Sequence, residues 1–312
     1  MRIVFWGSPA FAVFPLDALV AAGFAVVGVI TQPDRPAGRQ RQLTPPPVKV
    51  AAERLGLPVL QPTTLRDPAV VAAIAALHPD LGIIAAYGGI LRKKVMAIPP
   101  LGYLNIHPSL LPLHRGPAPV STAILLGDPD TGVSVMRLDP GPIDSGPILS
   151  QRRIPLAPDA RTGPLTDMLF HLGAELLLEA LSPYAAGTLI PQPQDHQQAT
   201  YSQLLQKEDG VIDWQRSALA IERQIRAYDP WPGTSTLWHG QPLKLLAAAP
   251  QATWTGNAPP GTLVARKPVP LVMTGEGVLA LQLVQPAGRR PMAASDWVRG
   301  LPAERQGERM GV

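Results

Sequence analysis

Hydrophobic and polar positions alternate in two ways along the first half of this chain. Short runs rich in aliphatic and β-branched residues predict strands at residues 3–6, 25–31, 81–85 and 103–106. The segments between them predict helices at residues 10–22, 48–55 and 69–77. This order of strand and helix is typical of a parallel α/β sheet, so we expect the chain to begin with an α/β domain.

The pattern changes in the second half of the chain. Residues 133–138 and 148–154 predict a hairpin of later strands, and residues 162–186 predict a helix that closes the first domain. Proline, glutamine and glycine become dense at residues 184–199, as is typical of a linker. Short apolar runs separated by turns then predict a small β barrel. The expected domains are residues 1–183, a linker at 184–202, and residues 203–312.

Composition narrows the class of protein. The 312 residues are 46% hydrophobic and 16% charged, which excludes a disordered chain and is typical of an ordinary soluble one. The absence of cysteine excludes disulfides and thiolate metal sites, and the six histidines lack zinc-like spacing, so no metal is expected. The net charge of +4 does not by itself favour a nucleic-acid partner.

The apolar segment at residues 11–30 is the one candidate for a membrane span. It contains Pro15, Asp17 and Gly23, and no positively charged leader precedes it, so a helix, a glycine turn and a buried strand explain it better. We therefore expect no membrane segment and a cytoplasmic protein.

The turn after the first predicted strand does not have the spacing of a dinucleotide-binding loop. Residues 7–11 lack the Gly-x-Gly-x-x-Gly pattern, which disfavours an oxidoreductase of the Rossmann type. We expect a tight strand-to-helix turn here, with Ser8 as the N-cap and Pro9 at the first helical position.

Three polar residues at the ends of apolar runs suggest chemistry. Asn105 and His107 lie two apart in an extended segment and so project to the same side. Asp144 lies in a later turn-rich loop, where Asp139 is expected only to shape the turn. An amide, an imidazole and a carboxylate suit a reaction in which an acyl carbon becomes tetrahedral. Taken alone, His107 is equally compatible with a packed histidine at a strand end.

The same residues bear on two features of the reaction: whether the enzyme forms a covalent intermediate, and which residue acts as the base. No cysteine and no Gly-x-Ser-x-Gly turn offers a covalent nucleophile near them, so direct transfer to an amine is favoured. Asp144 can hold a protonated His107 or a bridging water, and either residue can serve as the base.

Several motifs occur in an order typical of one superfamily. The chain carries Asn-Ile-His-Pro-Ser-Leu-Leu-Pro at residues 105–112, Arg-Gly-Pro-Ala-Pro at 115–119 and Asp-Pro-Gly-Pro-Ile-Asp-Ser-Gly at 139–146. Further matches lie at residues 31–39, 86–88 and 230–234. Over nearly its whole length the chain resembles the folate-dependent formyltransferases, and within them the members that act on methionyl initiator tRNA.

This resemblance implies a Rossmann-like formyltransferase domain followed by an OB-like barrel. It implies 10-formyltetrahydrofolate as co-substrate, with Asn105, His107 and Asp144 as catalytic residues. Folate contacts are expected from a loop and from a neighbouring strand exit. The residues concerned are Ser109, Leu110, Leu111, Pro112, Tyr87 and Gly88. The leucines and Tyr87 can instead belong to the core.

The resemblance also implies aminoacylated initiator tRNA as partner, bound by a monomer. The sixteen residues 32–47 show no predicted element, and loops of this length are often functional. Arg35, Arg39 and Arg41 are the expected tRNA contacts in this loop, against the alternative of a plain solvated loop. The alternatives for the whole protein are a formyltransferase acting on a sugar amine or on glycinamide ribonucleotide, a formyl-folate hydrolase, and a non-catalytic RNA-binding protein.

Overall fold

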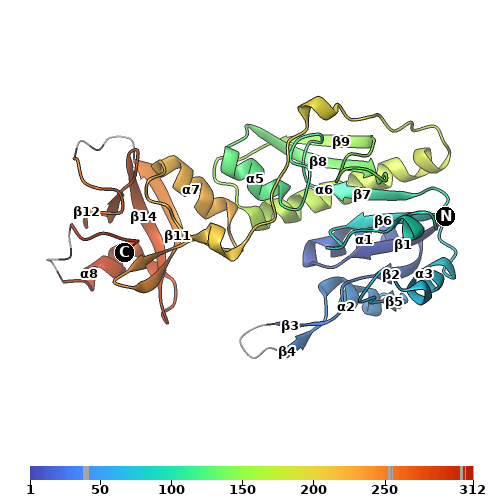
Figure 1. Cartoon of the computed structure of the whole chain (residues 1–312), viewed down its shortest axis with the longest axis horizontal. Coiled ribbons are helices and arrows are strands. Elements are labelled where there is room, and N and C mark those ends of the chain that lie inside the picture. Colours follow the sequence, from blue (N-terminus) through green and yellow to red (C-terminus); the bar gives the residue numbers. More distant parts are fainter. Residues whose placement is uncertain (38–41, 252–253, 255, 303–304, 306, 312) are drawn as a thin grey trace. The chain divides into compact units, whose positions relative to one another are not determined.

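A computed structural model describes residues 1–37, 42–251, 254, 256–302, 305 and 307–311. The chain forms two compact units, drawn in Figure 1. The first comprises Met1–Pro119, Asp130–Pro155 and Thr166–Ser202, and the second comprises Val120–Pro129, Leu156–Leu165 and Gln203–Val312. No helix in the described part of the chain is long and apolar enough to cross a membrane.

A seven-stranded sheet forms the centre of the first unit, in the order β5-β2-β1-β6-β7-β8-β9. Its strands are β1 (Arg2–Gly7), β2 (Ala25–Ile30), β5 (Val59–Leu60), β6 (Leu81–Ala85), β7 (Tyr103–His107), β8 (Asp130–Arg137) and β9 (Ile148–Pro155). The first five are mutually parallel, whereas β8 pairs antiparallel with β7, and β9 pairs antiparallel with β8. The predicted α/β domain with a parallel sheet is confirmed.

Helices connect and cover these strands. They are η1 (Ala10–Ala12), α1 (Val13–Ala21), α2 (Pro47–Arg54), α3 (Pro68–Ala75), α4 (Lys93–Met96), η2 (His196–Gln198) and α6 (Thr162–Ala185), which enters the first unit at Thr166. Gly173 of α6 lies directly on the sheet, because a Cβ there would come within 2.5 Å of Ile106 and 3.0 Å of Val133. A glycine at this position therefore lets α6 pack closely over β7 and β8.

Ser8 has a different role from the predicted helix cap, and that prediction was wrong. Pro9 occupies the N-cap position of η1 without a side-chain bond. The Ser8 hydroxyl instead donates to the carbonyl of Tyr87 (3.0 Å) and accepts from the Gln32 amide (3.2 Å). The reason is local: Ser8 lies where β1, β2 and β6 end, and backbone groups leaving those strands need partners.

The loop at residues 32–47 contains an element that the sequence pattern did not predict. β3 (Arg35–Ala37) and β4 (Gln42–Thr44) pair antiparallel as an isolated hairpin, seen projecting from the first unit in Figure 1. Strands of three residues are too short to show an alternating pattern, and Pro36 also argues against a strand. The base of the hairpin is anchored by Asp34, which accepts from Lys49 (2.8 Å) and Gln61 (2.6 Å).

The second unit is a β-rich domain, as predicted, and its paired strands are antiparallel. Its sheet runs β10-β11-β14-β13-β12, with β15 paired to β14. The strands are β10 (Ser235–Trp238), β11 (Gln241–Gln251), β12 (Leu263–Ala265), β13 (Leu271–Met273), β14 (Val278–Pro286) and β15 (Met292–Ala293). Helices α5 (Pro119–Leu126), η3 (Lys207–Gly210), α7 (Ala218–Ala227) and α8 (Ala294–Arg299) complete it.

Helix α7 was not predicted, although the sequence carries its signals. The Ser217 hydroxyl accepts from the Ala220 amide at 3.2 Å, which is an ordinary N-cap. Ala218, Ile221 and Ile225 have helical spacing, and all three are buried in the core of this unit beside Trp214.

Candidate active site

Strand β7 brings two of the predicted catalytic residues to its carboxyl end. β7 lies between β6, to which it is parallel, and β8, to which it is antiparallel. Asn105 and His107 occupy alternate positions of β7, so their side chains leave the same face of the sheet. Asn105 is only half-buried, and its side-chain amide forms no hydrogen bond with any residue in the described ranges. This amide remains available to a substrate.

His107 is almost completely buried, with 4% of its surface exposed, and both ring nitrogens face specific groups. Nε2 lies 3.0 Å from the carbonyl oxygen of His114. Because a carbonyl can only accept, Nε2 carries the proton and donates. In the neutral ring, Nδ1 therefore holds the lone pair. It lies 3.6 Å from Oδ2 of Asp144, close enough for charge interaction but too far for a direct hydrogen bond.

Asp144 approaches His107 from the loop between β8 and β9. Its backbone is in the left-handed region (φ +49°), where Asp is tolerated better than most side chains. Oδ2 accepts a hydrogen bond of 2.8 Å from the amide of Gly116. Gly116 is itself required, because its φ is +101° and a Cβ there would lie 2.9 Å from the carbonyl oxygen of Ser202. The fold thus brings together His107 and Asp144, which the sequence analysis had proposed as members of one site.

The electrostatics of the pair favour a neutral imidazole before substrate binds. Burial lowers the pKa of His107 below the ordinary histidine value, and it is the largest influence. The Asp144 carboxylate pulls this pKa back upward, while the positive charge of Arg115 pushes it further down. Without substrate, His107 is therefore a buried neutral base next to the Asp144 carboxylate. An imidazolium formed during a reaction would find that carboxylate already in place.

The predicted folate loop is tightly cross-linked through its backbone. The Ser109 hydroxyl donates to the Leu113 carbonyl (2.6 Å), and the Leu111 amide donates to the hydroxyl of Ser134 (3.1 Å). Gln151 donates to the Leu111 carbonyl at 2.8 Å. Ser109 and Leu111 are buried, so the second leucine packs in the core, as the alternative interpretation expected. Leu110 and Pro112 are the partly exposed members of the loop.

Tyr87 and Gly88 follow β6 but differ in exposure. The Tyr87 ring is 4% exposed and packs edge-on against Trp6, with centroids 4.9 Å apart. Burial raises the pKa of its phenol. The Tyr87 side chain is thus part of the core, which was the alternative interpretation. Gly88 is exposed, with φ +79°.

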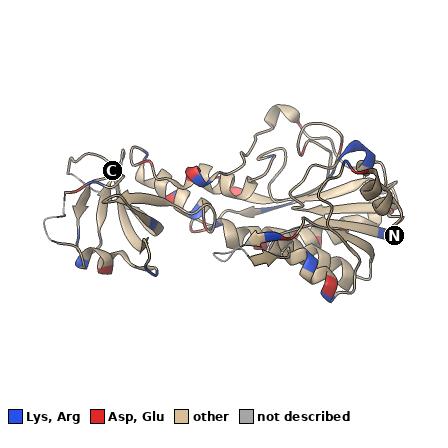
Figure 2. Cartoon of the chain, turned by 60° about the horizontal axis from the view of Figure 1, so that its bottom comes forward, with Lys and Arg blue, Asp and Glu red and all other residues tan. Residues whose placement is uncertain are grey.

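The structure describes only one of the three arginines that were expected to contact tRNA. Arg35 lies exposed on β3, where one guanidinium nitrogen donates to the Gln32 side chain at 3.1 Å. Arg39 and Arg41 lie outside the described residues. In Figure 2 the basic and acidic residues of the described parts of the chain are spread over the ribbons of both units.

Sequence reasoning missed Arg115 and Gln194 as parts of this site. Arg115 was noted only as part of a motif, and Gln194 lay in the predicted linker. Arg115 is 1% exposed and is hydrogen-bonded to Gln194, which in turn donates to the carbonyls of Asp144 and Gly146. The only sequence signal for either residue was the position of Arg115 at the start of the Arg-Gly-Pro-Ala-Pro motif.

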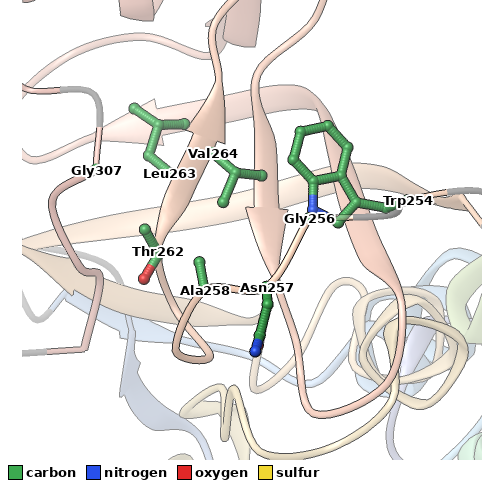
Figure 3. Close-up of a pocket in the computed structure, with 8 residues that line it drawn as sticks. All are labelled: Trp254, Gly256, Asn257, Ala258, Thr262, Leu263, Val264 and Gly307. Atoms are coloured by element: carbon green, nitrogen blue, oxygen red, sulfur yellow. The ribbon is translucent and has the colours of Figure 1, made fainter.

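A separate cavity of about 360 Å³ lies in the second unit (Figure 3). It is lined by Trp254, Gly256, Asn257, Ala258, Thr262, Leu263, Val264 and Gly307. This cavity contains none of the predicted site residues. Across the described residues, no group of three or more His, Asp or Glu side chains is placed to hold a metal ion.

Two family models match this chain. One, described as formyl transferase, covers residues 1–181, and the other, described as formyl transferase, C-terminal domain, covers residues 204–302. Methionyl-tRNA formyltransferase of Roseiflexus sp. (strain RS-1) is 61% identical over 312 residues, which are 100% of this chain and 95% of that protein. The enzyme of that name from Chloroflexus aggregans (strain MD-66 / DSM 9485) is 61% identical over 305 residues, covering 97% of this chain and 98% of that protein.

Solved structures with low sequence identity share the fold. HypX from Aquifex aeolicus in complex with tetrahydrofolic acid has a TM-score of 0.63 at 20% identity, over 96% of this chain and 47% of that one. The N-formyltransferase from Helicobacter canadensis in complex with folinic acid and dTDP-3-aminofucose has a TM-score of 0.67 at 17% identity, over 90% and 99%. On the strength of the family models and the full-length relatives, the chain belongs to the formyl transferase family and, within it, to the methionyl-tRNA formyltransferases.

Proposed function

We propose that this protein transfers the formyl group of 10-formyltetrahydrofolate to the α-amino group of methionyl initiator tRNA. The observation that carries the proposal is the buried His107 3.6 Å from Asp144, on the same strand face as Asn105, whose amide has no hydrogen-bond partner among the described residues. These groups occur in a chain that is 61% identical over its length to a methionyl-tRNA formyltransferase.

The proposed base is the neutral His107. A free α-amine titrates near about 8, so a useful fraction of the acceptor is already neutral and nucleophilic at physiological pH. As the amine nitrogen bonds to the formyl carbon it loses a proton, and Nδ1 of His107 has the lone pair to accept it. The resulting imidazolium lies beside the Asp144 carboxylate, whose Oδ2 is held by Gly116. The same proton then goes to the folate nitrogen as the carbon–nitrogen bond to folate breaks, so no covalent enzyme adduct is required.

Asn105 supplies the proposed oxyanion contact. The formyl oxygen gains negative charge when the carbon becomes tetrahedral, and an amide N–H donor aimed at that oxygen stabilises the charge. Asn105 suits this role because its amide has no competing partner among the residues that the structure describes. Donation to the oxyanion costs the enzyme no existing hydrogen bond.

We propose the rigid loop at residues 109–112 and the exposed backbone at Gly88 as the folate contacts. The loop backbone is hydrogen-bonded to Ser134 and Gln151, so it can present its partly exposed edge to a flat ring without reorganising. The aliphatic parts of Leu110 and Pro112 would contact the ring, while the core ring of Tyr87 would support the strand end from behind.

The tRNA assignment concerns both parts of the chain. We propose residues 1–183 as the catalytic domain, residues 184–202 as the connection, and residues 203–312 as an OB-like tRNA-binding domain. Arg35, Arg39 and Arg41, within residues 32–47 of the sequence, are the proposed contacts of the first domain with the acceptor end. A monomer acting in the cytoplasm, where translation begins, completes the proposal.

One assay tests the function against its rivals. Purified protein is incubated with 10-formyltetrahydrofolate in three reactions, with methionyl initiator tRNA, with an amino sugar nucleotide, and with neither acceptor. We expect formylmethionine in the first reaction alone. Formylation of the sugar would reassign the acceptor, and formate release without any acceptor would indicate a hydrolase.

A further inference from the structure

We propose that residues 192–202, which we call the strap, hold the catalytic pair in register and that Gln194 is a positioning residue for Asp144. The inference rests on the proposed function only for the identity of the molecule that receives the formyl group. The geometry concerns how His107, at the end of β7, and Asp144, in the loop between β8 and β9, are kept 3.6 Å apart.

The strap is joined to the first unit along much of its length. At one end, Gln192 pairs with Ile148 through two backbone bonds of 2.8 and 2.7 Å. At the other end, Arg115 donates its amide to the Thr200 carbonyl, and Ser202 donates its amide to the Arg115 carbonyl at 2.7 Å. These contacts place the strap across the two loops that carry Asp144 and the residues 114–116.

Arg115 explains why the strap is strongly held. Its guanidinium is fully buried, with 1% of the residue exposed, and it contacts Gln194, His196 and Tyr201 at 2.7, 2.9 and 3.3 Å. All three partners act as neutral acceptors, because a guanidinium can only donate and the Nδ1 of His196 must therefore be unprotonated. Removing the strap would leave a buried charge without partners, which is costly. Arg115 and the strap thus stabilise each other.

Gln194 links this anchor to the catalytic loop. Its side-chain oxygen accepts from Nε and Nη2 of Arg115, at 3.1 and 2.7 Å. Its side-chain nitrogen donates to the carbonyls of Asp144 (2.8 Å) and Gly146 (2.6 Å). Gln194 is 7% exposed, so water does not readily replace it. The amide therefore ties the backbone at Asp144 and just after it to the fixed charge of Arg115.

Thr200 serves the other member of the pair. Its hydroxyl accepts from the His114 amide at 2.8 Å, and the carbonyl of His114 accepts from Nε2 of His107. The strap therefore reaches Asp144 through Gln194 and reaches His107 through Thr200 and His114. A displacement of the strap would misalign both groups, and misplacement by about 1 Å can cost up to about 100-fold in rate.

The substitution Gln194→Glu separates positioning from mere packing. A glutamate keeps the size of the side chain and the acceptor for Arg115, to which it adds an ion pair. It replaces the nitrogen donor with an oxygen that repels the carbonyls of Asp144 and Gly146. We expect a folded protein with an unchanged melting temperature or a higher one, kcat lower by about 10- to 100-fold, and KM for both substrates within about twofold.

The matched control is Gln197→Glu, the same substitution at an exposed position of the strap. We expect wild-type kcat from it. The Gly116 amide donates to Asp144, and its hydrogen-exchange rate can be measured without any formyl-accepting substrate. It should be faster in Gln194→Glu than in wild type, and unchanged in Gln197→Glu.

A second pair of variants covers the case in which Gln194→Glu does not fold. Thr200→Val removes the acceptor for His114 at an exposed site, whereas Thr200→Ser retains it. We expect Thr200→Val to lower kcat by roughly 10-fold and Thr200→Ser to restore it. Wild-type kcat and wild-type Gly116 exchange in Gln194→Glu, or equal rates in the two Thr200 variants, would overturn the proposal. Wild-type enzyme that fails to formylate tRNA would instead refute the proposed function, with the exchange measurement still deciding the role of the strap.

Discussion

At the scale of single residues, the candidate site depends on which polar groups already have partners. Asn105 has none for its amide among the described residues, whereas Oδ2 of Asp144 is held by Gly116 and Nε2 of His107 by His114. The two groups that would handle charge are thus oriented by backbone atoms, and the group that would contact the oxyanion is open.

Loss of either member of the pair should affect chemistry more than binding. We expect His107→Ala and Asp144→Asn each to lower the single-turnover rate by at least about 100-fold, since general acid–base groups commonly contribute that much. The dissociation constant for the folate should change little. Near-normal single-turnover rates in either variant would remove that residue from the proposed mechanism.

The buried environment of His107 predicts an unusual titration. Because burial lowers its pKa, the imidazole signal in NMR should titrate below the ordinary value of about 6.5. Asp144→Asn removes the carboxylate that raises this pKa and leaves the positive charge of Arg115 and the neighbouring His114 in place. The midpoint should therefore fall further in that variant. A midpoint above 6.5 in wild type would show that Asp144 outweighs burial.

At the scale of elements, short segments without a clear hydrophobic pattern carry most of the unexpected structure. The β3–β4 hairpin is held at its base by Asp34, Gln61 and Lys49. The hydrogen bond from Gln61, followed by that from Lys49, lowers the pKa of the Asp34 carboxyl. Helix α6, by contrast, follows its predicted bounds closely and depends on Gly173 for its approach to β7.

The hairpin should matter to the tRNA and not to the folate. We expect Arg39→Ala to raise KM for methionyl-tRNA severalfold while leaving folate binding unchanged, because a guanidinium group is suited to binding a phosphate. Limited trypsin cleavage in the hairpin should slow when tRNA is added. Wild-type kinetics together with cleavage indifferent to tRNA would leave the hairpin as a surface connection.

Gly173→Ala sets two effects of opposite sign against each other. Alanine gains up to about 1 kcal/mol of helix propensity over glycine. The new Cβ, however, would lie 2.5 Å from Cγ2 of the buried Ile106, and overpacking commonly costs about 1–3 kcal/mol. We expect net destabilisation in urea unfolding, with Met168→Ala on the exposed face of α6 as a near-neutral control. Higher stability in Gly173→Ala would show that the helix moves away at little cost.

At the scale of the whole molecule, the second unit is not formed only by the residues that follow the strap. Residues 120–129 and 156–165 belong to it by their contacts. Arg161, for example, pairs with Asp229 at 2.9 Å, and the Thr162 hydroxyl donates to the Ala227 carbonyl at 2.6 Å. A cut after Ser202 would remove those partners, so the role of the second unit is better tested in the full chain.

Salt dependence supplies that test. If tRNA binding uses phosphate contacts, its affinity should fall linearly on a log–log plot against salt, with a slope that grows with the number of phosphates neutralised. Folate binding, measured in parallel, should have a much smaller slope. Equal slopes for the two ligands would argue against an electrostatic tRNA platform in this protein.

The sequence alone determined the order of the main strands and helices of the first unit, because strand and helix periods are local and runs such as β6 and α6 show them clearly. It also singled out Asn105 and His107, since residues two apart in a strand must share a face. Only the tertiary structure decided that Tyr87 is core, that Ser8 joins three strand ends, and that Gln194 ties Arg115 to the Asp144 loop. These contacts join residues far apart in the chain, and a local pattern carries no information about which buried donor will meet which acceptor.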